Sequence, residues 1–308
     1  MNNTLITIVV PVYNTDLDKL ERCLKSIPDH SNVRVRIYDD CSTKYNAEFE
    51  ISRIINNNSS LSHLYKEGNK FIRLNSNKGL GFVRNQSIKD LYDESEYVIF
   101  LDSDDEVSLS EDEINKILSD SNKGILARFY NIELISDSKV SIEGYNKYLG
   151  QKMIPYFITP AVYNVRYLSD NNILFDESRR TFEDIQFSVK LWTNIISSCT
   201  DYNKLISISD NTVIYKYHLE GESLTRNDNL NKMSDDLYYW INWIKLYYND
   251  LHESSKESIK PYLFNRIRYE SLKIMSMKMK VNNDLYKYSD LVDMMKPYNI
   301  DNVMTNTF

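Results

Sequence analysis

Clusters of carboxylates are the residues of this sequence most able to do chemistry. Asp102, Asp104 and Asp105 fall within four consecutive positions, directly after an apolar run typical of a buried strand. Carboxylates this close repel one another, and a hard divalent cation with oxygen ligands would relieve the repulsion. The alternative is a solvated acidic turn in which Asp105 caps the next helix. Asp39 and Asp40 follow an earlier predicted strand, and an Asx-type turn is their alternative interpretation.

A third acidic pair, Glu183 and Asp184, comes directly before a predicted helix from Ile185 to Asn194. Capping of that helix and interaction with its dipole would explain the pair without catalysis. His218 follows a predicted strand from Ile206 to Tyr215. This histidine could ligate a metal, donate to a phosphate or have a structural role.

The elements that must position these residues alternate between strands and helices in the N-terminal third. Strands are expected at Leu5 to Val10, Val33 to Tyr38, Phe71 to Leu74 and Tyr97 to Leu101, with helices at Leu17 to Ile27, Ala47 to Ile55 and Gly81 to Tyr92. Pro11 should end the first strand, and Thr15 with Asp18 resembles a capping box. The alternation predicts a parallel sheet, whose ligands bind beyond the carboxyl ends of its strands.

The composition argues against several classes of protein. The chain has 308 residues and a net charge of −7, which argues against a general nucleic-acid-binding protein. It contains 7 glycines and neither a G-x-x-x-x-G-K-[ST] nor a G-x-G-x-x-G segment, so a bound nucleotide must be held by other means. The 3 scattered cysteines favour a reducing compartment, and no signal peptide or membrane-spanning run is evident. We therefore expect a cytoplasmic protein, with a role at the membrane surface left open.

Five segments, taken in order, resemble family 2 of the GT-A glycosyltransferases. They are Ile6–Asn14, Tyr38–Thr43, Asn77–Asn85, Leu101–Asp105, and Phe175–Glu177 followed by Glu183–Asp184. The resemblance covers roughly residues 4 to 225. Cys41 stands where the family usually has glycine, so this loop requires Cys41 to accept a turn conformation.

The resemblance implies that the chain binds a nucleoside diphosphate sugar, most often a UDP-sugar in this family. Asp39 would accept a hydrogen bond from uracil N3–H. Asp104 would ligate Mn²⁺ or Mg²⁺ bridging the diphosphate, and His218 is a candidate further ligand. The other implied nucleotide-binding residues are Pro11, Val12, Tyr13, Asn14, Lys78, Arg84, Asp102 and Ser103. For Lys78 and Arg84 the alternative is a solvated basic turn.

The resemblance also implies an inverting transfer. Asp184 would remove the proton from the acceptor hydroxyl while its oxygen attacks the anomeric carbon. Glu183 would shape the turn or contact the acceptor, which would be a glycan or lipid-linked glycan in cell-surface polysaccharide synthesis. Two alternatives are a non-catalytic sugar-nucleotide-binding or assembly protein, and a phosphatase that uses Asp102 and Asp104 as its D-x-D motif.

The expected fold class is α/β, with a GT-A catalytic domain over residues 1–225 and a helical C-terminal extension over 226–308. The catalytic domain would be Rossmann-like, with a mainly parallel sheet. Its nucleotide half would cover about residues 1–105, and its acceptor half about residues 106–225.

A basic stretch lies in the expected C-terminal helices, between Tyr262 and Val281. Its basic residues, Arg266, Arg268, Lys273, Lys278 and Lys280, oppose only Glu270. These helices could pack on the catalytic domain or join two copies of the chain in a homo-oligomer. Alternatively, they could meet anionic lipid or a lipid-diphosphate acceptor at the inner face of the membrane.

Overall fold

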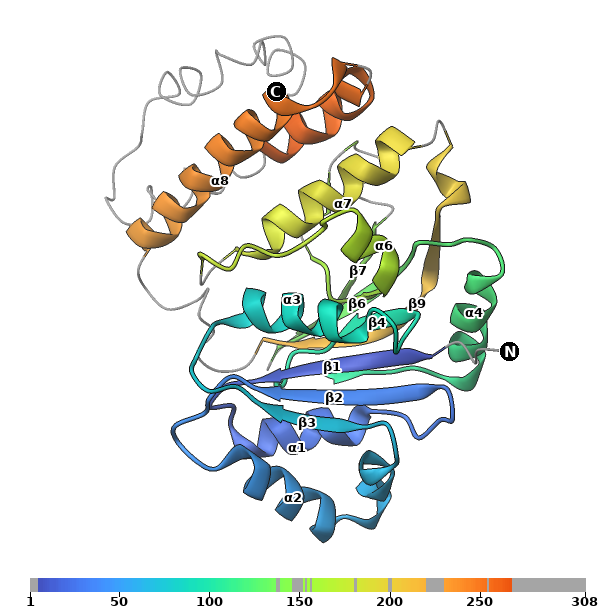
Figure 1. Ribbon diagram of the computed structural model, residues 1–308, viewed down its shortest axis with the longest axis vertical. Helices are drawn as coiled ribbons and strands as arrows, with labels where there is room; N and C mark the ends of the chain where they lie inside the picture. Colours follow the sequence, from blue (N-terminus) through green and yellow to red (C-terminus); the bar gives the residue numbers. More distant parts are fainter. Residues whose placement is uncertain are drawn as a thin grey trace. The chain divides into compact units, whose positions relative to one another are not determined.

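The computed structural model describes residues 5–136, 139–145, 152, 154–155, 157–179, 182–198, 201–219, 230–253 and 255–267 (Figure 1). The chain forms two compact units. Unit one comprises Met1–Lys147 with Pro155–Gly221, and unit two comprises Tyr148–Ile154 with Glu222–Phe308. The domain boundary expected at residue 225 lies outside the described residues.

Four parallel strands form the first part of the sheet in unit one. They are β1 (Ile6–Val12), β2 (Val33–Asp39), β3 (Lys70–Arg73) and β4 (Tyr97–Phe100), in the spatial order β3-β2-β1-β4. Every residue of β1 and β4 is buried, as in strands covered on both faces. Figure 1 shows α3 (Leu80–Leu91) on one side of these strands and α1 (Leu17–Ser26) with α2 (Ala47–Asn57) on the other. A 3₁₀ helix, η1 (Ser59–Tyr65), follows α2.

The first strand is longer than the sequence predicted. It continues through Pro11 to Val12, paired with β2, instead of ending at Pro11. β4 pairs with β1 only from Ile6 to Val9, so Pro11 has a strand neighbour on one side only. A missing N–H is tolerated at such a position, which is why the strand can include a proline.

The first helix begins with a different cap from the predicted one. Asp16 is the N-cap of α1, and its carboxylate accepts a hydrogen bond from the backbone N of Asp18. Thr15, the expected cap, instead hydrogen-bonds through its Oγ1 to Ser103 Oγ at 2.6 Å. This hydrogen bond ties the loop after β1 to the acidic loop after β4.

The second part of the sheet mixes strand directions. Its strands are β5 (Glu106–Val107), β6 (Ala127–Ser136), β7 (Lys139–Glu143), β8 (Ala161–Asn164) and β9 (Ile206–His218). The full order is β3-β2-β1-β4-β8-β6-β9-β5, with β7 beside β6. β8 is antiparallel to both β4 and β6, whereas β6 and β9 are parallel. The predicted α/β class is confirmed, with purely parallel pairing among β1 to β4 and mixed pairing in the rest of the sheet.

The helices of this second part are α4 (Glu111–Ser121), α6 (Val165–Asp170), α7 (Asp184–Ser198) and the 3₁₀ helix η2 (Tyr202–Lys204). An aromatic core joins α7 to the sheet. Phe187 of α7 stacks on Phe175 with ring centroids 4.3 Å apart, and Phe175 meets Phe100 of β4 edge-on at 5.5 Å. Trp192, one turn further along α7, stacks on Phe129 of β6 at 5.0 Å. This packing fixes the start of α7 relative to the end of β4.

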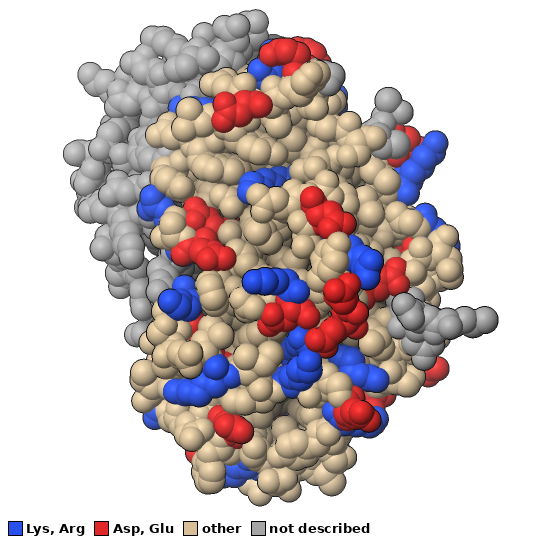
Figure 2. Space-filling view, viewed as in Figure 1, with Lys and Arg blue, Asp and Glu red and all other residues tan. Residues whose placement is uncertain are grey.

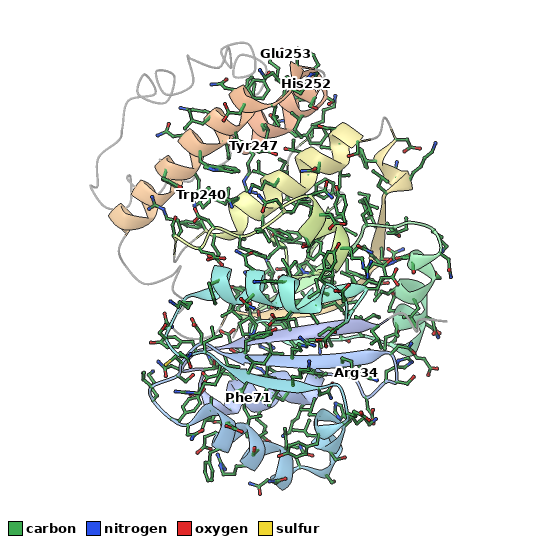
Figure 3. The ribbon with its side chains drawn as sticks, in the orientation of Figure 1. Arg34, Phe71, Trp240, Tyr247, His252 and Glu253 are labelled. Atoms are coloured by element: carbon green, nitrogen blue, oxygen red, sulfur yellow. The ribbon has the colours of Figure 1, made fainter. Side chains whose placement is uncertain are left out.

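Unit two contains α8 (Leu230–Asp250) and a further helical segment at residues 255–267. Trp240 and Ile244 of α8 are fully buried, and Tyr247 stacks on Trp243 with ring centroids 5.1 Å apart. Figure 3 marks Trp240 and Tyr247 along this helix. Within the described ranges, no helix is both long and apolar enough to cross a membrane.

One residue of the basic stretch does not have the surface position that a lipid-binding role requires. Arg266 is 2% exposed, and its Nη1 donates to the backbone oxygen of Ile154 at 3.2 Å. Arg266 holds two segments of unit two together, so it has a structural role and not the predicted contact with lipid. Arg268, Glu270, Lys273, Lys278 and Lys280 lie outside the described residues.

Candidate active site

The carboxylate of Asp39 lies at the carboxyl end of β2 and is fully buried. Its Oδ1 accepts from the backbone N of Ser42 at 2.9 Å, and its Oδ2 pairs with Arg73. Arg73 is the last residue of β3 and lies opposite Asp39 in the strand register. Cys41 has a φ of 62°, so the turn conformation expected where the family usually has glycine is confirmed.

The loop after β1 is tied to this turn through Asn14. The backbone N of Asn14 donates to Ser42 Oγ at 2.9 Å, and its side-chain Oδ1 accepts from the backbone N of Thr43 at 2.8 Å and of Lys44 at 2.9 Å. Pro11 and Val12 are buried in β1, whereas Tyr13 is 48% exposed. Of these four predicted nucleotide-binding residues, Tyr13 therefore presents the most side-chain surface to solvent.

Asp40 has a role that the sequence interpretation missed. Its buried carboxylate accepts from the backbone N of Lys78 at 2.6 Å and of Gly79 at 2.7 Å. Gly79 is the N-cap of α3, with a φ of 95°, and it has no side chain that could cap the helix. Asp40 therefore caps α3 from the neighbouring loop. The side chain of Lys78 is exposed, and its predicted role toward the nucleotide stays a prediction.

Arg84 links two of the acidic motifs. Its side chain is 3% exposed, which excludes the solvated basic turn. Nη2 donates to Asp102 Oδ1 at 2.7 Å, and Nη1 donates to Glu183 Oε1 at 3.3 Å. Burial opposes the charge of Arg84, but the two carboxylates outweigh burial and raise the pKa of the guanidinium.

The acidic loop after β4 holds two different kinds of carboxylate. Asp104 is exposed, whereas Asp105 is 1% exposed and accepts from Tyr215 Oη at 2.8 Å and from the backbone N of His218 at 2.8 Å. Burial, and then the charges of Asp102 and Asp104, raise the pKa of Asp105 to about 8. Ser110 caps α4, so the interpretation of Asp105 as a helix cap is wrong.

Asp104 fits the predicted role of metal ligand by its chemistry. Desolvation by the surrounding protein and then repulsion from Asp102 raise its pKa, so a cation beside this carboxylate would be favourable. In the part of the chain that the structure describes, no three His, Cys, Asp or Glu side chains are placed to hold a metal together. A Mg²⁺ or Mn²⁺ ion here would therefore rely on one or two carboxylates, with diphosphate and water completing its shell.

His218 lies beside this loop but faces another carboxylate. Its Nε2 is 2.6 Å from Glu106 Oε1, and Glu106 Oε1 is also 3.9 Å from Arg22 Nε. Arg22 in turn donates from Nη2 to the backbone oxygen of Asp104 at 2.8 Å. The predicted metal role of His218 stays a prediction, and its observed contact is to Glu106.

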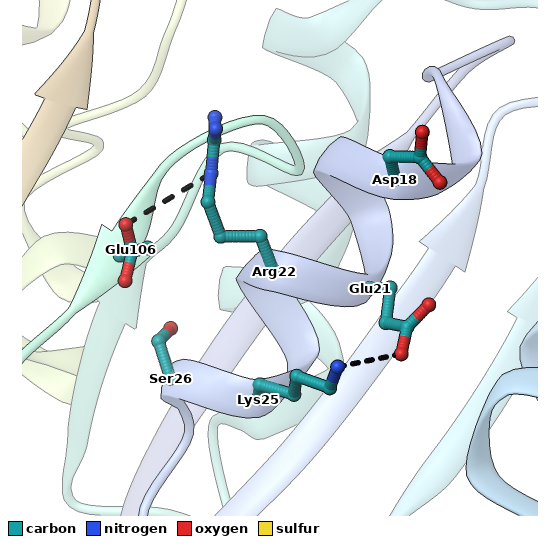
Figure 4. Close-up of a pocket in the computed structure, with 6 residues that line it drawn as sticks. All are labelled: Asp18, Glu21, Arg22, Lys25, Ser26 and Glu106. Carbon is teal, nitrogen blue, oxygen red and sulfur yellow. Dashed lines mark ion pairs between the residues drawn. The ribbon is translucent and has the colours of Figure 1, made fainter. Parts of the chain in front are cut away.

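A pocket of about 420 Å³ lies against α1 (Figure 4). It is lined by Asp18, Glu21, Arg22, Lys25, Ser26 and Glu106. None of the predicted site residues lines it, and its charges are mixed in sign. Acidic and basic side chains are likewise interspersed on the face of the molecule shown in Figure 2. Neither the pocket nor this face shows a concentration of positive charge that would bind an anion.

Glu183 and Asp184 occupy the turn into α7, as predicted. Phe182 has a φ of 59°, and Asp184 is the first residue of the helix. Glu183 is 7% exposed; burial, and then the charge of Asp184, raise its pKa to about 7 against the opposing effect of Arg84. Asp184 is only partly buried.

The segment before this turn is held against α3. Asn85 accepts from the backbone N of Phe175 at 2.9 Å and donates to its backbone oxygen at 3.0 Å. It also donates to Glu177 Oε1 at 2.8 Å. A Cβ at Gly81 would lie 2.6 Å from the backbone oxygen of Asp176, so only glycine allows this approach. The first two turns of α3 therefore hold the segment that leads to Glu183 and Asp184.

An α/β sheet with acidic motifs at the carboxyl ends of β2 and β4, and a third at the start of α7, is the arrangement expected of the GT-A class of glycosyltransferases. The sequence model for "Glycosyl transferase family 2" matches residues 7–171. The chain belongs to this family, which confirms the resemblance seen in the sequence and leaves the D-x-D phosphatase without support.

Known relatives agree with this assignment. The chain is 25% identical over 295 residues to poly(ribitol-phosphate) beta-N-acetylglucosaminyltransferase TarS of Staphylococcus aureus, a match that covers 90% of this chain and 47% of TarS. The chain thus spans about half the length of this curated relative.

Two solved structures share the fold. Residues 1–349 of S. aureus TarS in complex with UDP match with a TM-score of 0.58 at 18% identity, covering 95% of this chain and 78% of that one. The mannosyltransferase PcManGT of Pyrobaculum calidifontis, in complex with GDP-Man and Mn²⁺, matches with a TM-score of 0.56 at 13% identity. That match covers 98% of this chain and 87% of the mannosyltransferase. At these identities the likeness concerns the fold.

Proposed function

We propose that this glycosyltransferase moves a sugar from a UDP-sugar to a hydroxyl of a glycan or lipid-linked glycan, with inversion at the anomeric carbon. The observation that carries the proposal is the chain of contacts Asp102–Arg84–Glu183, which connects the donor-side and acceptor-side motifs within unit one. Asp39 lies at the carboxyl end of β2, separated from β4 by β1, on the edge of the sheet where ligands of parallel sheets bind.

On the donor side, Asp39 accepts a hydrogen bond from uracil N3–H once Arg73 leaves its buried Oδ2, next to the loop that Asn14 ties in place. Asp102 would contact the ribose. A divalent cation at Asp104, when bound, neutralises charge on the departing diphosphate. The UDP in the TarS structure and the Mn²⁺ in the mannosyltransferase structure support this part of the proposal.

On the acceptor side, we assign the general base to Asp184. Glu183 is buried and bound to Arg84, whereas Asp184 is partly buried at the first turn of α7. Asp184 removes the hydroxyl proton as the acceptor oxygen attacks, and the nucleoside diphosphate leaves from the opposite face of the sugar. Single displacement by this route inverts the anomeric configuration.

The name of the relative TarS describes N-acetylglucosamine transfer to poly(ribitol-phosphate). This similarity supports an N-acetylhexosamine donor, and a polymer of the cell surface as acceptor, for the present chain as well. Such an enzyme would work in the cytoplasm, where nucleotide sugars are the donors, or at the inner face of the membrane.

The test is UDP release from a panel of UDP-sugars with Mn²⁺, with and without glycan and polyol-phosphate acceptors. We expect slow release from at least one donor without acceptor and faster release with the right acceptor. The product's anomeric configuration, measured by NMR, should be opposite to that of the donor. Tight UDP-sugar binding with no release under any condition would instead identify a non-catalytic binding protein.

A further inference from the structure

Arg84 was expected to face the nucleotide, but its observed partners give it a different role. Both of its terminal nitrogens donate to carboxylates, at 2.7 Å to Asp102 and 3.3 Å to Glu183. The guanidinium carbon also lies 5.2 Å from the ring centroid of Phe175 and 5.8 Å from that of Phe100. With 3% of the residue exposed, a direct contact with a nucleotide would require breaking these carboxylate contacts.

We propose that Arg84 is a positioning residue that keeps the Asp102 carboxylate and the Glu183–Asp184 turn at a fixed position relative to each other. This inference rests on the proposed function. Removing the buried guanidinium from between the two carboxylates would leave their charges uncompensated, so the arrangement in which both contacts are made is favoured. The planar guanidinium presents its donors at a fixed spacing, whereas an ammonium group is a compact point charge without that geometry.

The surroundings of Arg84 support a role in alignment. One residue further along α3, Asn85 fixes the backbone of Phe175, and one turn earlier Gly81 allows the close approach of Asp176. These contacts dock the whole segment that leads to the Glu183–Asp184 turn. Unlike Asn85 and Gly81, Arg84 also contacts the loop after β4, through its hydrogen bond to Asp102. Donor and acceptor groups that must react within a narrow range of distances depend on such alignment.

The test compares Arg84→Met and Arg84→Lys with a matched control, Arg166→Met. Arg166 is an arginine of the same unit that also pairs with a carboxylate and lies over an aromatic ring, 3.3 Å from Asp93 and 5.3 Å from the ring centroid of Tyr92, but its side chain is 61% exposed. UDP affinity is measured by calorimetry with Mn²⁺, turnover is measured with the best UDP-sugar of the panel, and thermal melting checks folding.

For Arg84→Met we expect kcat to fall by about 100-fold, while the Kd for UDP rises by less than about fivefold. In the Arg84→Met background, Glu183→Gln should lower kcat by less than about twofold further, because the two residues act as a unit. A rise in Kd above about tenfold would make Arg84 a direct nucleotide ligand and overturn the inference. Unchanged kcat, or effects of the two substitutions that multiply, would also overturn it.

Arg84→Lys covers the case in which the methionine variant fails to fold. Lysine keeps the charge but lacks the fixed donor spacing of the guanidinium, so we expect kcat to fall about tenfold, whereas wild-type kcat would refute the positioning role. If the wild-type chain neither binds nor consumes any UDP-sugar, the proposed function fails separately. The positioning role is then read from hydrogen exchange at the first turn of α7. Exchange there should be faster in the Arg84 variants than in Arg166→Met, and equal rates would refute the role.

Discussion

The carboxylate of Asp40 offers a sharp test of how the site is built. It accepts two backbone N–H groups at the start of α3, from Lys78 at 2.6 Å and from the N-cap residue Gly79 at 2.7 Å, and Gly79 itself has no side chain that could cap the helix. The substitution Asp40→Asn preserves shape but turns one acceptor oxygen into an NH₂ group. One buried N–H of the pair then faces a donor instead of an acceptor.

The expected loss of stability has two parts. A buried N–H without a partner costs about 1–3 kcal/mol, and removing a negative charge from a helix N-terminus costs about 0.3–1 kcal/mol. Together these give a reduction in the free energy of unfolding of roughly 1–4 kcal/mol. That is a large fraction of the typical stability of about 5–15 kcal/mol.

Urea unfolding followed by fluorescence measures this loss. With m values of about 1–3 kcal/mol/M, the midpoint should fall by roughly 0.5 M or more. Asp93→Asn is the matched control, since Asp93 is 83% exposed and pairs only at the surface with Arg166, and we expect no resolvable shift. If Asp40→Asn unfolds at the same midpoint as Asp93→Asn, the reasoning about α3 capping is wrong.

Four further outcomes follow from the site. Asp184→Asn should lower kcat by about 10²–10⁴-fold with nearly unchanged UDP affinity, and near-normal kcat would remove Asp184 from the mechanism. Chelation by EDTA should abolish activity, Mn²⁺ or Mg²⁺ should restore it, and Asp104→Ala should be inactive yet folded; full activity in chelator argues against the metal. Calorimetry should show tighter binding of UDP than of GDP or ADP, and weaker UDP binding by Asp39→Ala, whereas equal affinity for GDP would refute the uracil assignment. Because the pKa of Asp105 is raised to about 8, the folded state retains a proton that the unfolded state releases. The stability that this proton provides is present below about pH 4 and lost as pH rises through 8. Urea midpoints of the metal-free protein should therefore fall over this range, and less steeply in Asp105→Asn; a flat profile for the wild type would contradict this.

The parts of the fold that the sequence predicted are those with a strong local signal. β1 and β4 are short runs of buried, mostly apolar residues, and β2 is rich in β-branched and aromatic residues, so the local sequence was enough to place these strands. The positive φ of Cys41 and the start of α7 at Asp184 were predictable because each belongs to a motif whose local shape is specified. The continuation of β1 through Pro11 was not predictable, because the tolerance for proline depends on how far β4 extends alongside β1.

The contacts that assemble the site were less predictable because they are non-local. Arg73 pairs with Asp39 since the register of β2 and β3 places the two residues opposite each other. The available signal was Arg73, a basic residue near the end of a predicted strand. Its pairing with Asp39 could be recognised only once the register of β2 and β3 was known. The contact of Arg84 with Glu183 depends on the fold of the intervening segment, for which the sequence between about 124 and 180 gave no clear pattern.

The thiol of Cys41 gives this protein a native attachment point in the turn that contains Asp39. Of the two cysteines in the described part of the chain, Cys23 is fully buried, and burial raises its thiol pKa well above the ordinary value. Cys41 is only partly buried, in the turn that also contains Asp39 and 4.0 Å from Arg73 Nη2. A thiol-directed fluorophore on Cys41 would therefore mark the turn that contains Asp39 without any engineered residue. If Asp39 has the proposed role toward uracil, the rate at which the fluorophore attaches should change when UDP is added, even before an acceptor is known.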